Sequence, residues 1–305
     1  MKKVIITGPT GAIGMALINK CIEMNMEVTA ICHRRSKRIK NFPITEKLQI
    51  VECDLAELVD FTDELGNNYD TFYHLAWACT VGETRNDVSA QMNNIKYTID
   101  AVELAKRLGC KRFIGAGSQA EYGRSDKKLN SSVPTFPENA YGIAKLCAGQ
   151  LSRIRCEQLG LEHIWTRILS VYGPYDGENA MISTLIRGLK NKQELHFTKC
   201  EQIWDYCYSD DAANALYLLG EGGKSGKTYC IGSGVEKPLI EYLRCVTSLI
   251  DPQAKLGIGD IPYGEKQVMY LCADISELKQ DVGFEPKYTF VDGIKETIKW
   301  FDKQG

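Results

Sequence analysis

The chain has 305 residues, of which 44% are hydrophobic and 25% are charged, the proportions of an ordinary globular protein. Its formal net charge is −2, so no global excess of positive charge indicates a nucleic-acid or anionic-membrane partner. Because no apolar run has the length of a membrane span and the first predicted strand leaves no room for a signal peptide, we expect a cytoplasmic protein.

The first fourteen residues have the pattern of a strand, a glycine turn and the start of a helix. A short strand is predicted at 2–7, glycines with the spacing Gly-x-x-Gly-x-x-Gly follow it, and apolar residues then recur at helical spacing. In a dinucleotide-binding unit such glycines permit a tight turn, close approach of a pyrophosphate and close packing of the helix. The helix N-terminus also offers free N–H groups to the phosphates. The residues predicted to hold the cofactor here are Gly8, Thr10, Gly11, Ala12, Ile13 and Gly14.

A second strand is predicted over residues 27–32, and the residues at its end bear on the choice of cofactor. Folds that prefer NAD place an acidic residue here, which binds the ribose hydroxyls. This chain has Cys32 instead, followed by a basic segment. Guanidinium groups can hold a 2′-phosphate bidentately, so His33, Arg34 and Arg35 predict a preference for NADP(H) over NAD(H). The alternative is a basic loop that only faces solvent.

Three more strands are predicted over residues 48–55, 71–77 and 111–117. Ligands bind at the carboxyl ends of the strands in an open α/β sheet, so the residues at these ends are candidates for binding. An adenine amino group could donate to a carboxylate at the end of the first of these strands. The residues predicted to contact the cofactor here are Asp54, Leu55, Leu75, Ala76 and Trp77, and the third strand delivers Ser118.

A tyrosine and a lysine complete the candidate catalytic site. A helix is predicted over residues 140–159, and Tyr141 and Lys145 share one of its faces because they are four residues apart. A free tyrosine is a poor acid or base at neutral pH, and a nearby ammonium group lowers the pKa of the phenol. Such a tyrosine can protonate an alkoxide that forms from a carbonyl, while Ser118 donates a hydrogen bond to the same oxygen. Lys145 and Tyr141 can also contact the nicotinamide ribose of the cofactor.

The alternation of strands and helices predicts an α/β fold with a doubly wound parallel sheet, the Rossmann arrangement. A sixth strand is expected at 163–171 and another at 204–208, with helices at 181–189, 210–219, 239–250 and 290–301. The regular alternation ends near the sixth strand. We therefore predict a dinucleotide-binding domain of residues 1–170 and 203–228, and a smaller, interwoven α/β substrate domain of residues 171–202 and 229–305.

The cysteines and histidines do not indicate a metal site. The 12 cysteines are scattered through apolar patterns, and no Cys-x-x-Cys pair occurs among them. The 4 histidines do not pair at the spacing of metal ligands. We expect reduced thiols and no bound metal.

Taken together, these motifs resemble the extended short-chain dehydrogenase/reductases, the NAD-dependent epimerase/dehydratase family, in the branch that acts on nucleotide sugars. The resemblance covers nearly the whole chain, and its segments are 7–14, 74–76, 118–123, 141–145, 167–174 and 204–211. It implies that Ser118, Tyr141 and Lys145 are the catalytic triad and that Asn94 is a structural asparagine. It also implies a nucleoside-diphosphate sugar as substrate. A homodimer built from helices at about 89–108 and 140–159 is implied too, although their apolar stripes fit core packing equally well.

The substrate-binding residues are predicted from the same resemblance. Arg187 lies on a predicted helix that could reach a diphosphate, and Lys266 stands where relatives often place an arginine. The full predicted set is Ser118, Gln119, Tyr141, Ser170, Arg187, Trp204 and Lys266. The base of the nucleotide, whether CDP, dTDP, GDP or UDP, and the configuration at C4 of the product stay open.

Departures from the family pattern reduce the number of reactions that this chain is expected to catalyse. The family's 4,6-dehydratases carry acidic residues just after the triad hydroxyl, where this chain has Gln119 and Ala120. Glu121 is displaced by at least one place, which would point it elsewhere on a strand-like segment. Members that epimerise C3 and C5 use a cysteine where Ala120 stands. Both activities are therefore disfavoured, which leaves 4-keto reduction and 4-epimerisation.

The basic segment favours reduction, because cytosolic reducing power is mostly NADPH. Many epimerases also carry asparagine at the position of Ser170 and arginine at that of Trp204. The sequence resembles reductases that make 6-deoxyhexoses such as CDP-abequose or dTDP-fucose. We therefore predict an NADPH-dependent reductase of a nucleoside-diphosphate 4-keto-6-deoxyhexose. The alternative enzyme is an NAD-dependent 4-epimerase of the UDP-hexose type. A non-catalytic NADP(H) sensor is a third hypothesis, against which the intact triad argues.

Overall fold

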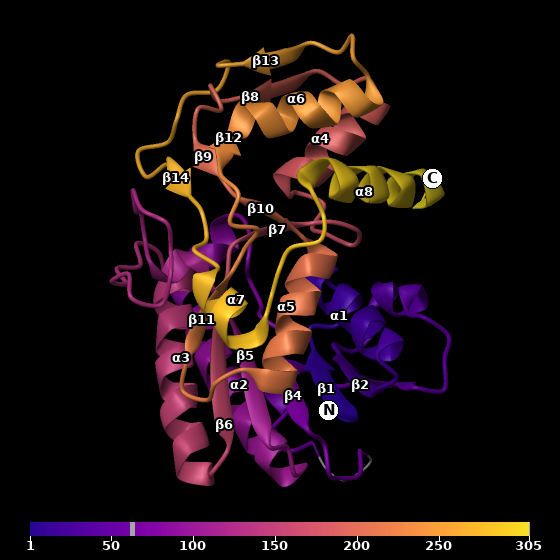
Figure 1. The fold of residues 1–305 in the computed structure, drawn as a ribbon, viewed down its shortest axis with the longest axis vertical. Helices are drawn as coiled ribbons and strands as arrows, with labels where there is room; N and C mark the ends of the chain where they lie inside the picture. Colours follow the sequence, from indigo (N-terminus) through magenta and orange to yellow (C-terminus); the bar gives the residue numbers. More distant parts are fainter. Residues whose placement is uncertain (62–64, 305) are drawn as a thin grey trace.

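The computed structural model describes residues 1–61 and 65–304. The larger part of the protein is built on a seven-stranded sheet, most of whose strands are labelled in Figure 1. The strand order is β11-β6-β5-β4-β1-β2-β3, and all the pairs in it are parallel. The bounds are β1 (Lys3–Thr7), β2 (Glu27–Cys32), β3 (Leu48–Glu52), β4 (Thr71–His74), β5 (Arg112–Ser118), β6 (Glu162–Ile168) and β11 (Thr228–Ile231). The order reverses between β1 and β4, where such sheets bind ligands. The predicted doubly wound parallel sheet is confirmed.

Helices cover both faces of this sheet, because its central strands are buried on both sides. Helices α1 (Ala12–Glu23) and α5 (Ser209–Gly222) pack against each other on one face. Helices α2 (Val88–Arg107) and α3 (Ala140–Leu159) pack together on the other. Within the described ranges, no helix has the length and apolar character that crossing a membrane requires.

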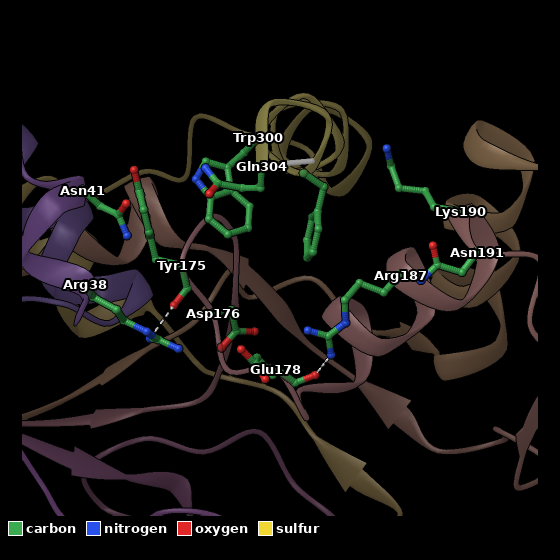
Figure 2. A pocket seen from close by; sticks show the side chains of 11 residues that line it. Arg38, Asn41, Tyr175, Asp176, Glu178, Arg187, Lys190, Asn191, Trp300 and Gln304 are labelled. Carbon is green, nitrogen blue, oxygen red and sulfur yellow. Dashed lines mark hydrogen bonds between the residues drawn. The ribbon is translucent and has the colours of Figure 1, made fainter. Parts of the chain in front are cut away.

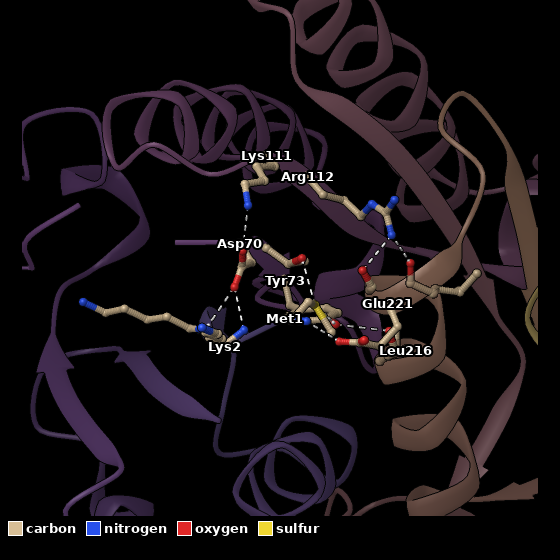
Figure 3. Close-up of polar contacts among 12 residues, drawn as sticks. Met1, Lys2, Asp70, Tyr73, Lys111, Arg112, Leu216 and Glu221 are labelled. Carbon is tan, nitrogen blue, oxygen red and sulfur yellow. Dashed lines mark hydrogen bonds and ion pairs between the residues drawn. The ribbon is translucent and has the colours of Figure 1, made fainter. Parts of the chain in front are cut away.

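Polar contacts hold the amino ends of the strands together (Figure 3). The Asp70 carboxylate accepts a hydrogen bond from the backbone N–H of Lys2 at 2.6 Å and pairs with Lys111 at 3.1 Å. The amino group of Met1 pairs with Glu221 on α5 at 2.6 Å. These contacts fix β1, β4, β5 and α5 to one another at the end of the sheet opposite the ligand-binding edge.

The smaller part lies beyond the carboxyl edge of the sheet (Figure 1). Its strands form three small sheets, β7 (Ser170–Tyr172) with β10 (Tyr206–Tyr208), β9 (Ile203–Trp204) with β12 (Lys237–Pro238) and β14 (Tyr270–Leu271), and β8 (Leu195–Phe197) with β13 (Leu256–Ile258). Its helices are α4 (Met181–Lys190), α6 (Leu239–Ile250) and α8 (Phe290–Gln304), and α7 (Ser276–Val282) packs beside α5 and β11. Short 3₁₀ turns are η1 (Lys37–Asn41), η2 (Leu55–Glu57), η3 (Glu83–Asn86) and η4 (Gln119–Glu121).

Two predicted strands are each divided in the structure. The run at 163–171 forms β6 and then β7, which leaves the large sheet and pairs with β10. The run at 204–208 is interrupted at Asp205. Its buried carboxylate accepts backbone hydrogen bonds from Ser233 at 2.9 Å and Ala273 at 3.1 Å, which turns the chain aside.

The predicted domain boundaries need two corrections. The boundary at 228–229 falls inside β11, which pairs with β6 as the last strand of the large sheet. Residues 203–204 form β9, which belongs to the three-stranded sheet of the smaller part. The assignment of the smaller part to the substrate stays a prediction.

Candidate active site

The glycine turn between β1 and α1 leaves the backbone open to a ligand. Gly8 has a φ of +68°, and a Cβ there would lie 2.7 Å from the backbone nitrogen of Ala76. A Cβ on Gly14 would lie 2.3 Å from the Gly8 carbonyl oxygen, so this glycine brings the helix close to the turn rather than to the strand. A Cβ on Gly11 would meet nothing within 4 Å, and no side chain caps the helix there. The first backbone N–H groups of α1 therefore have no side-chain partner, and such groups can bind the pyrophosphate of a dinucleotide.

A cavity of about 560 Å³ extends from this turn toward the smaller part of the protein. Several of the predicted residues line it, namely Gly8, Gly11, Ala12, Ile13, Gly14, Leu75, Tyr141 and Ser170. The loop after β4 also contributes Val81 and Arg85, and α4 contributes Met181 and Ile182. The sequence pattern does not mark these residues, because the loop has no periodicity and the helix reaches the cavity only through the tertiary fold.

Ser118 ends β5, and a tight turn fixes its position. Its Oγ accepts a hydrogen bond from the backbone N–H of Ala120 at 3.1 Å, and its own N–H donates to Glu121 at 2.8 Å. This reciprocal arrangement is a capping box at the start of η4. Ser118 also acts on Tyr141, whose pKa it lowers.

Glu121 points into the core and not toward a substrate. The carboxylate is fully buried and accepts hydrogen bonds from Arg167 Nε at 2.7 Å and from Trp165 Nε1 at 3.0 Å. The segment is a 3₁₀ turn, so the predicted strand-like geometry is wrong. The side chain nevertheless points away from the substrate position, as predicted, because Arg167 and Trp165 hold its carboxylate in the core. The acidic positions of a dehydratase are taken by Gln119, which is half-buried, and by Ala120.

Tyr141 stands in the first turn of α3, where the Asn139 side chain caps the helix. The Trp77 ring meets the Tyr141 ring edge-on, with 6.1 Å between centroids. The guanidinium carbon of Arg85 lies 4.4 Å from the centroid of the Tyr141 ring. Burial raises the pKa of Tyr141, while Ser118 and the positive charge of Arg85 lower it.

Lys145 lies one helical turn further on, and its side chain is buried. Its Nζ donates to the Ala116 carbonyl, lies 3.8 Å from the centroid of the Trp77 ring, and is 5.8 Å from that of Tyr141. Burial lowers the pKa of Lys145 to about 7. The nearest cation to the Tyr141 ring is therefore Arg85, and not Lys145 as the spacing predicts. The role of Lys145 at the nicotinamide ribose stays a prediction.

Carboxylates surround the basic segment after β2. Arg34 donates through Nε and Nη2 to Glu57, at 3.1 and 2.7 Å, and its backbone N–H donates to Asp54 at 3.0 Å. Glu52 accepts a hydrogen bond from the backbone N–H of Arg35 at 3.1 Å. The positive charge of this basic segment is thus partly neutralised by nearby carboxylates. The sequence of the segment alone does not indicate this. A 2′-phosphate would have to compete with Glu57 for Arg34.

The other predicted cofactor residues lie at the loop edges of the sheet. His33 is exposed, with Nδ1 3.7 Å from an Asp54 oxygen. Leu55 begins η2, so the strand predicted to reach it ends earlier, at Glu52. The fourth strand likewise ends at His74, which places Leu75, Ala76 and Trp77 in the following loop. Thr10 lies in the glycine turn. Asn94 is buried and bonds both backbone groups of Ala78, at 3.0 and 2.9 Å, which holds this loop in place.

Comparison with known proteins identifies the family. The profile of the NAD dependent epimerase/dehydratase family matches residues 4–232. The chain belongs to this family. It is therefore an oxidoreductase-type enzyme of the extended short-chain dehydrogenase/reductase class, as the motifs predict, and its family depends on a nicotinamide dinucleotide.

Relatives within the family differ in the reaction they are named for. The dTDP-glucose 4,6-dehydratase of Neisseria meningitidis is 24% identical over 99% of this chain and 93% of that protein. The UDP-N-acetylglucosamine 4-epimerase of Methanobrevibacter ruminantium M1, solved with UDP-N-acetylmuramic acid, has a TM-score of 0.90 at 24% identity, over 100% of this chain and 99% of that one. The UDP-glucose 4-epimerase of Thermotoga maritima has a TM-score of 0.85 at 22% identity, over 99% of each chain. These structural matches show the shared fold.

Two of the predicted substrate positions of this family member form one contact. Ser170 lines the cavity, and its Oγ accepts a hydrogen bond from Trp204 Nε1 at 2.8 Å. The indole is half-buried between the two parts of the protein. The two departures from the epimerase pattern are therefore coupled in space.

The two predicted phosphate contacts lie elsewhere. Arg187 lines a neighbouring pocket of about 590 Å³ together with Trp300, and it donates to the backbone carbonyl of Glu178 (Figure 2). Lys266 is exposed, and its positive charge acts on Glu138 at the surface. The structure thus brings neither cation to the wall of the cavity that Tyr141 lines.

Proposed function

We propose that this protein is an NADPH-dependent reductase of the 4-keto group of a nucleoside-diphosphate 4-keto-6-deoxyhexose. The observation that carries the proposal is that Tyr141, whose pKa Ser118 lowers, lines the cavity, while the carboxylate that follows Ser118 in the chain, Glu121, is committed to Arg167. Proton transfer at a single oxygen is the chemistry this arrangement supports, and elimination of water needs a further acid and base. A bound reduced nicotinamide would supply the hydride to C4.

The protein's own groups handle the proton and the phosphates. The Tyr141 hydroxyl donates its proton to the C4 oxygen as negative charge develops there, and the Ser118 hydroxyl donates a hydrogen bond to the same oxygen. The phenolate that remains on Tyr141 then regains a proton from solvent. The N–H groups at Gly11 and the following turn of α1 would hold the cofactor pyrophosphate.

The contact between Ser170 and Trp204 supports reduction over epimerisation. Many epimerases of the family carry asparagine and arginine at these positions. Here a hydroxyl and an indole joined by a 2.8 Å hydrogen bond take their place beside the cavity. A change in both members of one contact indicates that this wall of the site differs from that of an epimerase.

The reaction is tested by offering ketosugars to the purified protein. We expect NADPH absorbance to fall when dTDP-4-keto-6-deoxyglucose or its CDP counterpart is added, and to stay constant with UDP-glucose, which has no keto group. The proposal fails if neither ketosugar causes NADPH oxidation.

A 4-epimerase is the second candidate, and the carboxylates around the basic segment favour it. Glu52, Asp54 and Glu57 all contact the segment that follows β2, near the strand end where NAD-binding folds place an acid for the ribose hydroxyls. This candidate predicts that NAD co-purifies with the protein. It also predicts that UDP-hexoses interconvert without added cofactor.

The preference for NADP(H) gives a separate prediction for the basic segment. Replacing Arg34 and Arg35 with Ala should raise the Kd of NADPH by about tenfold or more, because charge-assisted contacts to the 2′-phosphate are lost, and should hardly change that of NADH. The matched control is Glu57→Gln, which releases Arg34 and should tighten NADPH binding. Fluorescence titration measures both constants. Equal changes for the two cofactors would show that the segment does not contact the 2′-phosphate.

We also propose a homodimer through α2 and α3. These helices pack against each other and still expose Val88, Met92, Ile143 and Ile154, by 61, 64, 55 and 44%. The double variant Met92→Glu/Ile143→Glu should shift the mass measured by light scattering from dimer to monomer. A control at Ile44, which is fully exposed and distant in sequence, should leave the mass unchanged. A monomeric parent protein would refute the dimer.

We place the protein in the cytoplasm. All 12 cysteines are unpaired, and most of them are buried. Burial raises the pKa of several of them, such as Cys110 and Cys156, to about 12. Unpaired thiols in this number suit a reducing compartment, which also supplies NADPH.

A further inference from the structure

Arg85 is a cation beside the catalytic tyrosine that neither the motifs nor the resemblance assign. It belongs to η3, in the loop after β4. The neighbouring Asn86 accepts a hydrogen bond from the backbone N–H of Ala140 at 3.1 Å, which joins this turn to the first residue of α3. The attachment sets the Arg85 guanidinium over the Tyr141 ring, 4.4 Å from its centroid. Both side chains line the same cavity.

The Arg85 side chain lacks an anionic partner among the residues that the structure describes. Its Nε is buried and has no hydrogen-bond partner there. None of the ion pairs within residues 1–61 and 65–304 includes it. A partly buried guanidinium is poorly solvated, so a negative charge that forms beside it is stabilised. The Tyr141 phenol, whose ring Arg85 contacts, is a group that can become negative.

The other charged groups around Tyr141 are committed to different partners. Lys145 donates to a backbone carbonyl and lies 5.8 Å from the centroid of the Tyr141 ring. Glu121, whose charge acts against the phenolate, is paired with Arg167 at 2.7 Å. Asp176 lines the same cavity, and its Oδ1 accepts a hydrogen bond from the backbone N–H of the next residue at 2.7 Å. Arg85 is thus the positive charge closest to the phenol ring.

We propose that Arg85 is a positioning residue that stabilises the phenolate form of Tyr141 in addition to Lys145. In this proposal the Arg85 guanidinium does not contact the substrate and acts only on Tyr141. The reaction at C4 is the one described under the proposed function. The inference deepens the proposed function, because the phenolate forms when Tyr141 gives its proton to the substrate. The effect of the Arg85 charge on the ionisation of Tyr141 exists in the free protein, so it can be measured without cofactor or sugar.

The sign of the effect follows from the charges. A cation within about 4–6 Å of an ionisable group favours its negative form and shifts its pKa by about 1–3 units. Burial raises the pKa of Tyr141, and Arg85 offsets part of that rise. Removing the Arg85 charge should therefore keep the phenol protonated to a higher pH.

The test places a fluorinated tyrosine, whose phenol is more acidic than that of tyrosine, at position 141. Its fluorine resonance reports the ionisation of this one side chain against the background of the other tyrosines. We expect Arg85→Gln to raise the titration midpoint by about one pH unit or more, and Arg85→Lys to raise it less because a charge is retained. The matched control is Arg124→Gln, which removes an exposed guanidinium paired with Glu138 and should leave the midpoint unchanged.

The outcomes separate this inference from the proposed function. An equal midpoint in the parent protein and Arg85→Gln would overturn the inference, even if NADPH is oxidised by a ketosugar. A raised midpoint supports the inference even if no ketosugar is turned over, in which case only the proposed reaction fails. If Arg85→Gln does not fold, Arg85→Met serves in its place, and an equal midpoint in that variant and the parent would count against the inference.

Discussion

Replacing Tyr141 with Phe should lower kcat for ketosugar reduction by about 10²–10⁴-fold, the usual contribution of a positioned general acid. The change removes only the hydroxyl. The ring that packs against Trp77 and Arg85 is kept. The Kd of NADPH should therefore stay close to that of the parent protein. Stopped-flow absorbance gives the rate, and fluorescence titration gives the binding constant.

The matched control for this substitution is Tyr288→Phe, which removes a hydroxyl from a tyrosine that is 36% exposed. Its turnover should equal that of the parent. Unchanged turnover in Tyr141→Phe would remove Tyr141 from the mechanism. A large loss of NADPH binding in the same variant would assign the tyrosine to binding instead.

Replacing Arg167 with Met should destabilise the protein by about 3–5 kcal/mol, because it leaves the Glu121 carboxylate buried without its counter-charge. The two side chains are 6% and 0% exposed, so water cannot replace the lost partner. Urea denaturation measures the free energy of unfolding, which is taken from the first unfolding transition. The variant should also lose activity, because Glu121 accepts the backbone hydrogen bond that fixes Ser118.

Two further variants test the cause of this loss. Arg124→Met breaks the exposed pair with Glu138 and should change stability little, because solvent screens such pairs. The double variant Glu121→Met/Arg167→Met removes both charges and should recover part of the stability lost by Arg167→Met alone. An equal loss of unfolding free energy in Arg167→Met and Arg124→Met would show that burial of the Arg167–Glu121 pair does not increase its contribution to stability.

The sequence predicts most of the large sheet because its information is local. A buried apolar run followed by glycines at 8, 11 and 14 predicts β1 and α1 closely, and β2, β4, β5 and β6 are similar buried runs. The positions of Ser118 and Tyr141 then follow from the carboxyl end of β5 and the start of α3. Local pattern alone is enough for these features.

Other features depend on contacts between distant segments, which a local pattern does not contain. The break at Asp205 arises from hydrogen bonds to Ser233 and Ala273. The basic segment loses much of its apparent charge to Glu57, which follows the next strand. Arg85 has no neighbours in sequence that mark it, because its significance comes from the Tyr141 ring on another helix.

The proposed reaction is tested most directly by following the hydride. NADPH carrying deuterium at the transferable position is mixed with the protein and a nucleoside-diphosphate 4-keto-6-deoxyhexose, and the sugar is examined by mass spectrometry and NMR. We expect one deuterium at C4 of the product for each NADPH oxidised. Interconversion of nucleotide hexoses without deuterium uptake, on a dinucleotide that stays bound, would contradict the reductase and identify a 4-epimerase.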